Sequence, residues 1–132
     1  MKNKLFLFGL VLLLGTSGLA LQVFAEENIT PANLSASCSA DNSEAVVSWV
    51  NPVSDALEQY FVYRSTVYGE VGGIVNPTSG SKNWLDSSSS GKTVSYSDTS
   101  IANGTRYYYS VRVKTVGGIY SEYTSQYPVS CG

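Results

Sequence analysis

A strictly alternating segment from Thr105 to Val116 constrains the possible folds more than any other feature of the sequence. Tyrosine or valine occupies positions 107, 109, 111 and 113, and the residues between them are mostly polar or charged. Alternation with a period of two is typical of a β-strand that has one buried side and one side facing water. No stretch after residue 25 keeps a helical period over a sustained length, so we expect an all-β domain.

Shorter segments rich in Val, Tyr and Thr predict further strands, because Gly, Pro, Asn and Ser separate them. These segments span residues 33–38, 45–50, 60–65, 92–97 and 119–127. Gly117-Gly118 predicts a tight hairpin turn, since glycine adopts positive φ without strain. We expect residues 66–91 to form loops around one or two short edge strands. About seven strands bury their apolar sides most simply as two sheets packed face to face, which predicts a β-sandwich.

The first 25 residues have the order of a secretory signal. Lys2 and Lys4 provide a short basic start, and an apolar run follows from Leu5 to Leu14. Small and aliphatic residues then precede an expected cleavage point between Ala25 and Glu26. This pattern predicts a signal peptide over residues 1–25 and a secreted or cell-surface protein.

A retained membrane anchor is the alternative for this segment, because Leu5 to Ala25 is just long enough to span a bilayer. Glycine and polar residues dilute its second half, and this favours cleavage. The folded domain is then expected over residues 26–132. Contact with a membrane is expected only if the N-terminal segment is retained.

Cys38 and Cys131 are the two cysteines of the chain and lie near opposite ends of the expected domain. Two buried free thiols and one disulfide are both compatible with this spacing. An exported protein meets an oxidising compartment, which favours the disulfide. Closing so long a loop would remove up to about 4–5 kcal/mol of chain entropy from the unfolded state.

Composition excludes several classes of chemistry. The chain has no histidine, which removes the usual Ser-His-Asp and Cys-His catalytic arrangements and ordinary zinc sites. Without Lys2 and Lys4 the eight basic residues become six against ten acidic ones, so the expected mature chain has a net charge of −4. Scattered bases on an acidic chain argue against a nucleic-acid partner. We expect no catalytic residues, no cofactor and no metal, and hence no enzyme.

Three motifs, taken in order, resemble the fibronectin type III family. The first is Val47-Ser48-Trp49 followed by Asn51-Pro52, the second is Tyr60 to Arg64, and the third is Ile101 to Tyr107. The resemblance implies an immunoglobulin-like sandwich of about seven strands over most of the expected mature chain. It implies that Trp49 anchors the core and that Tyr107 hydrogen-bonds back to the turn before it. It also implies that both cysteines fall at the same pole of the sandwich.

Ten tyrosines are many for 132 residues. Four of them, Tyr60, Tyr96, Tyr107 and Tyr109, are expected in the core. Tyr63 and Tyr108 are expected on the outer face of one sheet, and Tyr120, Tyr123 and Tyr127 are placed to extend that face. Outward-facing aromatic residues either form a contact surface or stabilise the sheet by cross-strand pairing. The candidate contact residues are therefore Tyr63, Tyr108, Tyr120 and Tyr123.

These observations predict a non-catalytic binding or adhesion module that contacts a protein or a polysaccharide. A structural spacer or a subunit of an extracellular or envelope assembly is the alternative, because a fold does not by itself define a function. Asn28, Asn33 and Asn103 begin Asn-x-Ser/Thr sequons, which matter if the source organism glycosylates them.

Overall fold

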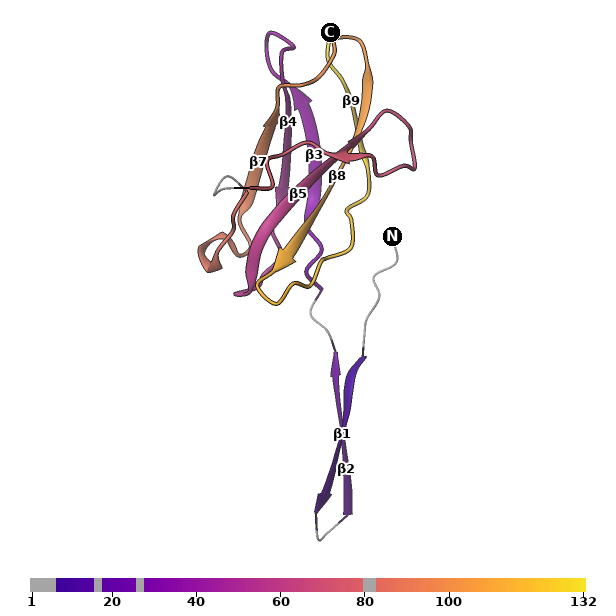
Figure 1. Ribbon diagram of the computed structural model, residues 1–132, viewed down its shortest axis with the longest axis vertical. Helices are drawn as coiled ribbons and strands as arrows, with labels where there is room; N and C mark the ends of the chain where they lie inside the picture. The colour runs from indigo at the N-terminus through magenta and orange to yellow at the C-terminus, as the bar shows by residue number, and fades with distance from the viewer. Residues whose placement is uncertain (1–6, 16–17, 26–27, 80–82) are drawn as a thin grey trace.

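The computed structural model describes residues 7–15, 18–25, 28–79 and 83–132 and contains two antiparallel sheets packed face to face (Figure 1). One sheet has three strands in the order β3 (Ala32–Cys38), β4 (Ala45–Val50), β7 (Thr93–Asp98). The other has four strands in the order β6 (Gly73–Ile74), β5 (Leu57–Ser65), β8 (Arg106–Thr115), β9 (Tyr127–Ser130). A single turn of 3₁₀-helix, η1, spans Ser87–Ser89. The predicted two-sheet sandwich is thus confirmed.

The N-terminal segment forms β1 (Leu7–Gly15) and β2 (Gly18–Ala25), which pair with each other in an antiparallel hairpin (Figure 1). Glu26, at the expected cleavage point, lies outside the described residues, so the signal peptide stays a prediction. Across the described ranges, no helix combines the length and apolar character that crossing a membrane requires.

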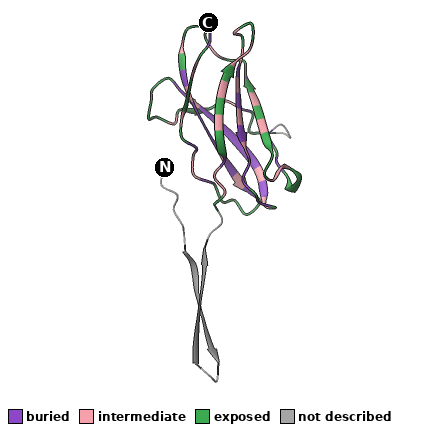
Figure 2. Cartoon of the chain, turned by 180° about the vertical axis from the view of Figure 1, so that it is seen from behind, coloured by how far each residue is buried: buried purple, intermediate pink, exposed green. Residues whose placement is uncertain are grey.

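The core lies between the sheets and is centred on Trp49, whose side chain is fully buried. The Trp49 ring packs 5.0 Å from the Tyr60 ring, and its Nε1–H donates a 2.9 Å hydrogen bond to Asn51 Oδ1. Figure 2 shows buried residues along the strands that face the interior, and exposed residues on loops and outward-facing positions of β3 and β7. On β8 the alternation places Tyr107, Tyr109, Val111 and Val113 in the core as expected, whereas the outward positions from Tyr108 to Lys114 are buried or half-buried instead of facing water.

The turn before β8 follows the expected pattern. The backbone N–H of Ala102 donates a 2.9 Å hydrogen bond to the Tyr107 hydroxyl, while the Tyr107 ring is buried. This bond joins the Tyr107 side chain to the backbone of the turn that precedes β8. The role inferred for Tyr107 is therefore confirmed.

The strand predicted over residues 119–127 was wrong. Within residues 119–130, regular pairing with β8 begins at Tyr127, the first residue of β9, and before it Tyr120 forms one isolated bridge with Lys114. Between them, Ser121 Oγ accepts the N–H of Val113 at 3.0 Å, and the Ser121 N–H donates to the Val113 carbonyl at 2.8 Å. A serine hydroxyl thus takes the place of a backbone carbonyl as the acceptor. The segment therefore completes the hydrogen bonds of Val113 on β8 without forming a regular strand.

The region 66–91 forms loops around the short edge strand β6, as expected. Two buried asparagines fix it to β5. Asn76 Oδ1 accepts the Val62 N–H at 2.7 Å, and the amides of Asn76 and Asn83 both donate to the Tyr60 carbonyl at 3.2 Å. Gly72 has φ +76°, and a Cβ there would overlap the Arg64 carbonyl, so only glycine fits this close approach.

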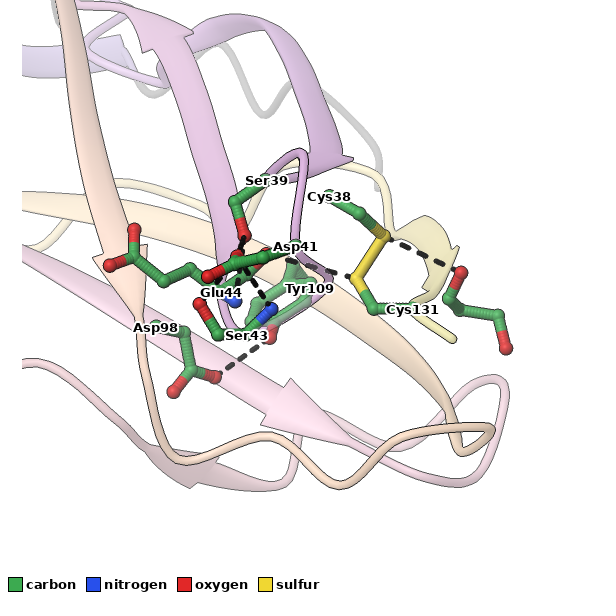
Figure 3. The surroundings of a disulfide bond; sticks show 9 residues. Cys38, Ser39, Asp41, Ser43, Glu44, Asp98, Tyr109 and Cys131 are labelled. Carbon is green, nitrogen blue, oxygen red and sulfur yellow. Dashed lines mark hydrogen bonds between the residues drawn. A yellow bond between two sulfur atoms is a disulfide. The ribbon is translucent and has the colours of Figure 1, made fainter.

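A disulfide joins Cys38 to Cys131, with the two Cα atoms 5.6 Å apart (Figure 3). Cys38 ends β3 in one sheet, and Cys131 directly follows β9 in the other. The bridge therefore links the edges of the two sheets at one pole of the sandwich. Both the predicted disulfide and the shared pole are confirmed.

A buried carboxylate lies near the same pole (Figure 3). Asp98 is 1% exposed, and its Oδ2 accepts hydrogen bonds of 2.7 Å from Arg64 Nη1 and from the Tyr109 hydroxyl. Its Oδ1 accepts the Ser100 N–H at 3.0 Å, so Asp98 also caps the turn that follows β7. Burial alone would raise the pKa of Asp98, but the bonds from Tyr109, Ser100 and Arg64 outweigh burial and lower it.

Removing the disulfide tests how much the sheet-to-sheet link stabilises the fold. Replacing Cys38 and Cys131 by alanine should lower the free energy of unfolding by about 3–5 kcal/mol, because the unfolded chain regains the entropy of a long loop. Urea unfolding of the oxidised protein, the reduced protein and the double variant measures this difference. The reduced wild type should match the double variant. An unchanged urea midpoint in both would contradict the assignment.

Replacing Asp98 by asparagine should lower the free energy of unfolding at pH 7 by about 3 kcal/mol, because Arg64 then keeps a partly buried charge without its partner. The pKa of Asp98 is lower in the folded than in the unfolded chain. The ionised Asp98 therefore stabilises the fold fully above pH 4, which is about the pKa of aspartate in the unfolded chain. This stabilisation is lost as the pH falls through the lower pKa that Asp98 has in the folded chain. Urea unfolding between pH 7 and pH 2 should show a weaker acid dependence in D98N.

Asp41 provides the matched control for this experiment. It is an exposed carboxylate, and hydrogen bonds from Ser43 and Ser39 lower its pKa to about 2. D41N should also weaken the acid dependence but should cost much less stability at pH 7, because it leaves no buried charge. If D41N and D98N lost equal amounts of unfolding free energy at pH 7, the buried Arg64–Asp98 pair would contribute no more to stability than an exposed carboxylate.

Candidate functional site

The candidate site is the outer face of the four-stranded sheet. On β8 the residues between the core positions point outward, and these include Ser110 and Arg112. On β5, Phe61 lies opposite Arg112 and Tyr63 lies opposite Ser110. Directly paired residues of antiparallel strands point to the same side of a sheet, so these four side chains share the outer face.

Segment 119–126 carries two further tyrosines onto this face. Ser121 and Thr124 each fix the segment to β8 through two hydrogen bonds. The Val111 N–H donates to Thr124 Oγ1 and the Thr124 N–H donates to the Val111 carbonyl. Ser121 makes the same pair of bonds with Val113. Tyr120 and Tyr123 adjoin these two anchors. Their rings are therefore held over β8 by hydrogen bonds on neighbouring residues.

Arg112 is the centre of an aromatic cluster on the outer face. Its guanidinium carbon lies 4.2 Å from the ring centre of Tyr120, 4.7 Å from that of Tyr123 and 5.4 Å from that of Tyr63. Its Nε–H donates a 2.9 Å hydrogen bond to the Tyr63 hydroxyl. The rings also meet each other, Tyr63 edge-on to Tyr123 at 5.0 Å and Phe61 tilted against Tyr120 at 5.8 Å. Each cation–π contact stabilises by about 0.5–2 kcal/mol, so the cluster is rigid.

The cationic charge of Arg112 has no carboxylate partner in the described part of the chain, where the ion pairs are Arg64–Asp98 and Glu58–Lys114. The Glu58–Lys114 pair is 3.8 Å long and lies at the surface beside the cluster, so it adds little stability. The aromatic rings therefore supply the main favourable environment for the Arg112 guanidinium.

The four contact residues predicted from the sequence differ in how far each is exposed to solvent. Tyr120 is 47% exposed, and Tyr108 and Tyr123 are half-buried. Tyr63 faces outward as expected but is only 5% exposed, because Tyr123 and Arg112 cover it. Tyr63 thus supports the surface from beneath, which corrects its expected place as a contact residue. Burial raises the pKa of the Tyr63 phenol although Arg112 opposes the shift.

Sequence reasoning missed two exposed aromatic residues of this face, both within the region 66–91. Tyr68 is 76% exposed, and its ring lies 5.6 Å from that of Tyr108. Trp84 is 49% exposed and forms a bridge with Gln59 on β5. No alternating pattern marks either residue, because both lie in loops. Trp84 follows the buried Asn83, and the loop that carries Tyr68 is held by two hydrogen bonds to Gln126.

Two grooves flank segment 123–126, which forms a wall of each. One, of about 270 Å³, lies on the side of loop 66–72. The other, of about 330 Å³, lies on the side of residues 30–34, at the open edge between the sheets. Across the residues that the structure describes, no group of three acidic, cysteine or histidine side chains is arranged to hold a metal ion.

The comparisons with known proteins identify the fold. No family model and no curated protein matches the chain. Among solved structures, an Fn3-like protein from Clostridium thermocellum is similar, with a TM-score of 0.56, 24% identity, and coverage of 74% of this chain and 86% of that one. The pectate lyase Pel3 from Pectobacterium carotovorum matches with a TM-score of 0.54 and 15% identity over 80% of this chain. The match covers 27% of the lyase.

At these identities the likeness establishes the architecture and not membership of a family. The two-sheet architecture of this chain is consistent with the neighbour described as Fn3-like. The chain therefore contains a β-sandwich with an Fn3-like, immunoglobulin-type fold.

Proposed function

We propose that this chain is an exported, non-catalytic binding module that contacts its partner through the outer face of the four-stranded sheet. The observation that carries the proposal is the cluster of tyrosine rings around Arg112, in which Tyr120 is exposed and Tyr123 is half-buried. Tyrosine and arginine are enriched among the residues that contribute most to binding interfaces. Rings already held in place lose little conformational entropy when a partner binds.

Export is the second part of this proposal. The disulfide fits an oxidising compartment, because such bonds persist outside the cytosol. The basic start and apolar run of the first 25 residues support the same location. A fold of this type carries many functions, so the surface and not the fold supports the binding role.

Replacing Tyr120 by alanine tests the surface directly. Tyr120 is exposed and covers Arg112, so Y120A should weaken binding to material from the native cell surface or medium by roughly tenfold or more. The measurement is the half-saturation concentration of the purified protein on that material. Thermal unfolding of Y120A, followed in parallel, should show a midpoint lower by only a few degrees, because the ring contacts with Arg112 and Phe61 are lost while the core is intact, so the variant stays folded in the binding assay.

Thr93 provides the matched control, because it is exposed on β7 on the outer side of the opposite sheet. T93A should bind as the wild type does. Equal binding by Y120A, T93A and the wild type would show that the aromatic face is not the contact surface. A wild-type protein that binds nothing and instead self-associates would support the structural-subunit alternative.

A further inference from the structure

The groove beside loop 66–72 is lined by uncharged side chains, several of which carry hydroxyl groups. Its volume is about 270 Å³, which is near the lower end of the range for small-molecule sites. The lining residues are Tyr68, Gly69, Val71, Ser110, Tyr123, Thr124, Ser125 and Gln126. None of these side chains carries a charge, and two of them are aromatic. The groove therefore offers ring faces and hydroxyls but no ionic group.

Ser110 forms part of this groove and holds a polar atom without a partner. The residue is 2% exposed, and its Oγ has no hydrogen bond within the described part of the protein. A buried hydroxyl that bonds to nothing is unfavourable and needs an explanation. A bound molecule with hydroxyl groups of its own would satisfy it.

Gln126 holds the opposite wall of the groove in place. Its Oε1 accepts the Gly69 N–H at 2.7 Å, and its Nε2 donates to the Glu70 carbonyl at 2.6 Å. These bonds draw loop 66–72 across the front of β8 and set the Tyr68 ring at the groove, 76% exposed. Because both ends of the Gln126 amide are engaged, the polar groups that the lining offers a ligand are side-chain hydroxyls, among them those of Ser110 and the exposed Ser125.

We propose that this groove binds a neutral sugar unit of a polysaccharide, an inference that rests on the proposed binding function and names its ligand class. The C–H face of a sugar ring packs on the electron-rich face of an aromatic ring, which Tyr68 presents. The sugar hydroxyls bond to Ser125 at the rim and to Ser110 beneath it. Ser110 lines this groove, and its unpaired Oγ is the buried polar group that a sugar hydroxyl would meet there.

The absence of charge in the groove lining selects a neutral sugar over an acidic one. An acidic sugar would lose hydration of its carboxylate without gaining an ionic partner among the lining residues. The expected net charge of −4 also repels polyanions at long range. The groove therefore disfavours acidic polysaccharides.

Affinity gel electrophoresis tests this proposal with the full domain. The probes are soluble β-glucan, galactomannan and xylan as neutral polysaccharides, with polygalacturonate as the acidic one. At least one neutral probe should retard the wild type, and polygalacturonate should not. Y68A should reduce the affinity by roughly tenfold or more, since it removes the exposed ring. T93A, on the opposite sheet, should migrate as the wild type does.

Ser110→Ala separates binding from stability. The variant should weaken binding to the neutral probe by about threefold to tenfold, because one hydrogen bond is lost. Its thermal midpoint should stay equal to or above that of the wild type, since an unpaired buried hydroxyl has been removed. A lower midpoint with unchanged affinity would overturn the role given to Ser110.

Three results of the electrophoresis would overturn the proposed sugar site. Retardation by no neutral probe, or equal retardation by polygalacturonate, would overturn the sugar site. An unchanged affinity in Y68A would do the same. If Y120A nevertheless loses binding to native material, the aromatic face remains the contact surface and only its ligand class has been wrongly inferred.

Discussion

Strand β8 has two covered sides and two bonded edges, and the rest of the structure depends on this arrangement. Its inner side packs into the core around Trp49, and its outer side presents Arg112 to the rings of Tyr120 and Tyr123. One edge pairs with β5, and the other is completed by β9 and by the hydroxyls of Ser121 and Thr124. The strict alternation of the β8 sequence makes this division possible, since a shift by one residue would exchange core and surface.

The site follows from the same strand. Because the core fixes the position of β8, Arg112 has a fixed position on the outer face, and the tyrosines pack on it without a flexible support. The disulfide adds a link between the two sheets at the pole where β3 and β9 end. A surface held in this way is expected to keep its shape if a partner binds to it.

Much of the fold could be predicted from the sequence, because the relevant signals are local. The strand over residues 45–50 matches β4, and the alternation of β8 follows from a short pattern. These two features need only periodicity and turn chemistry. The Tyr107 corner and the shared pole of the cysteines were implied by the resemblance of three motifs to a known family, and the structure shows both.

The features that the sequence did not reveal depend on contacts between distant residues. The hydroxyls of Ser121 and Thr124 replace carbonyls only because β8 lies beside them, so a strand was predicted there instead. The buried bonds that Asp98 accepts from Arg64 and Tyr109 come from two other strands, which no local pattern brings to it. The burial of Tyr63 likewise needs a loop residue, Tyr123, which no local pattern places over it.

Amide hydrogen exchange tests most directly whether β8 is enclosed in this way. The N–H groups of Val111 and Val113 donate to the hydroxyls of Thr124 and Ser121. If segment 119–126 is docked as described, these two amides should exchange among the slowest in the protein, at a rate near that of global unfolding. Exchange at the rate of exposed loops, while the amides of β4 stay protected, would contradict the account.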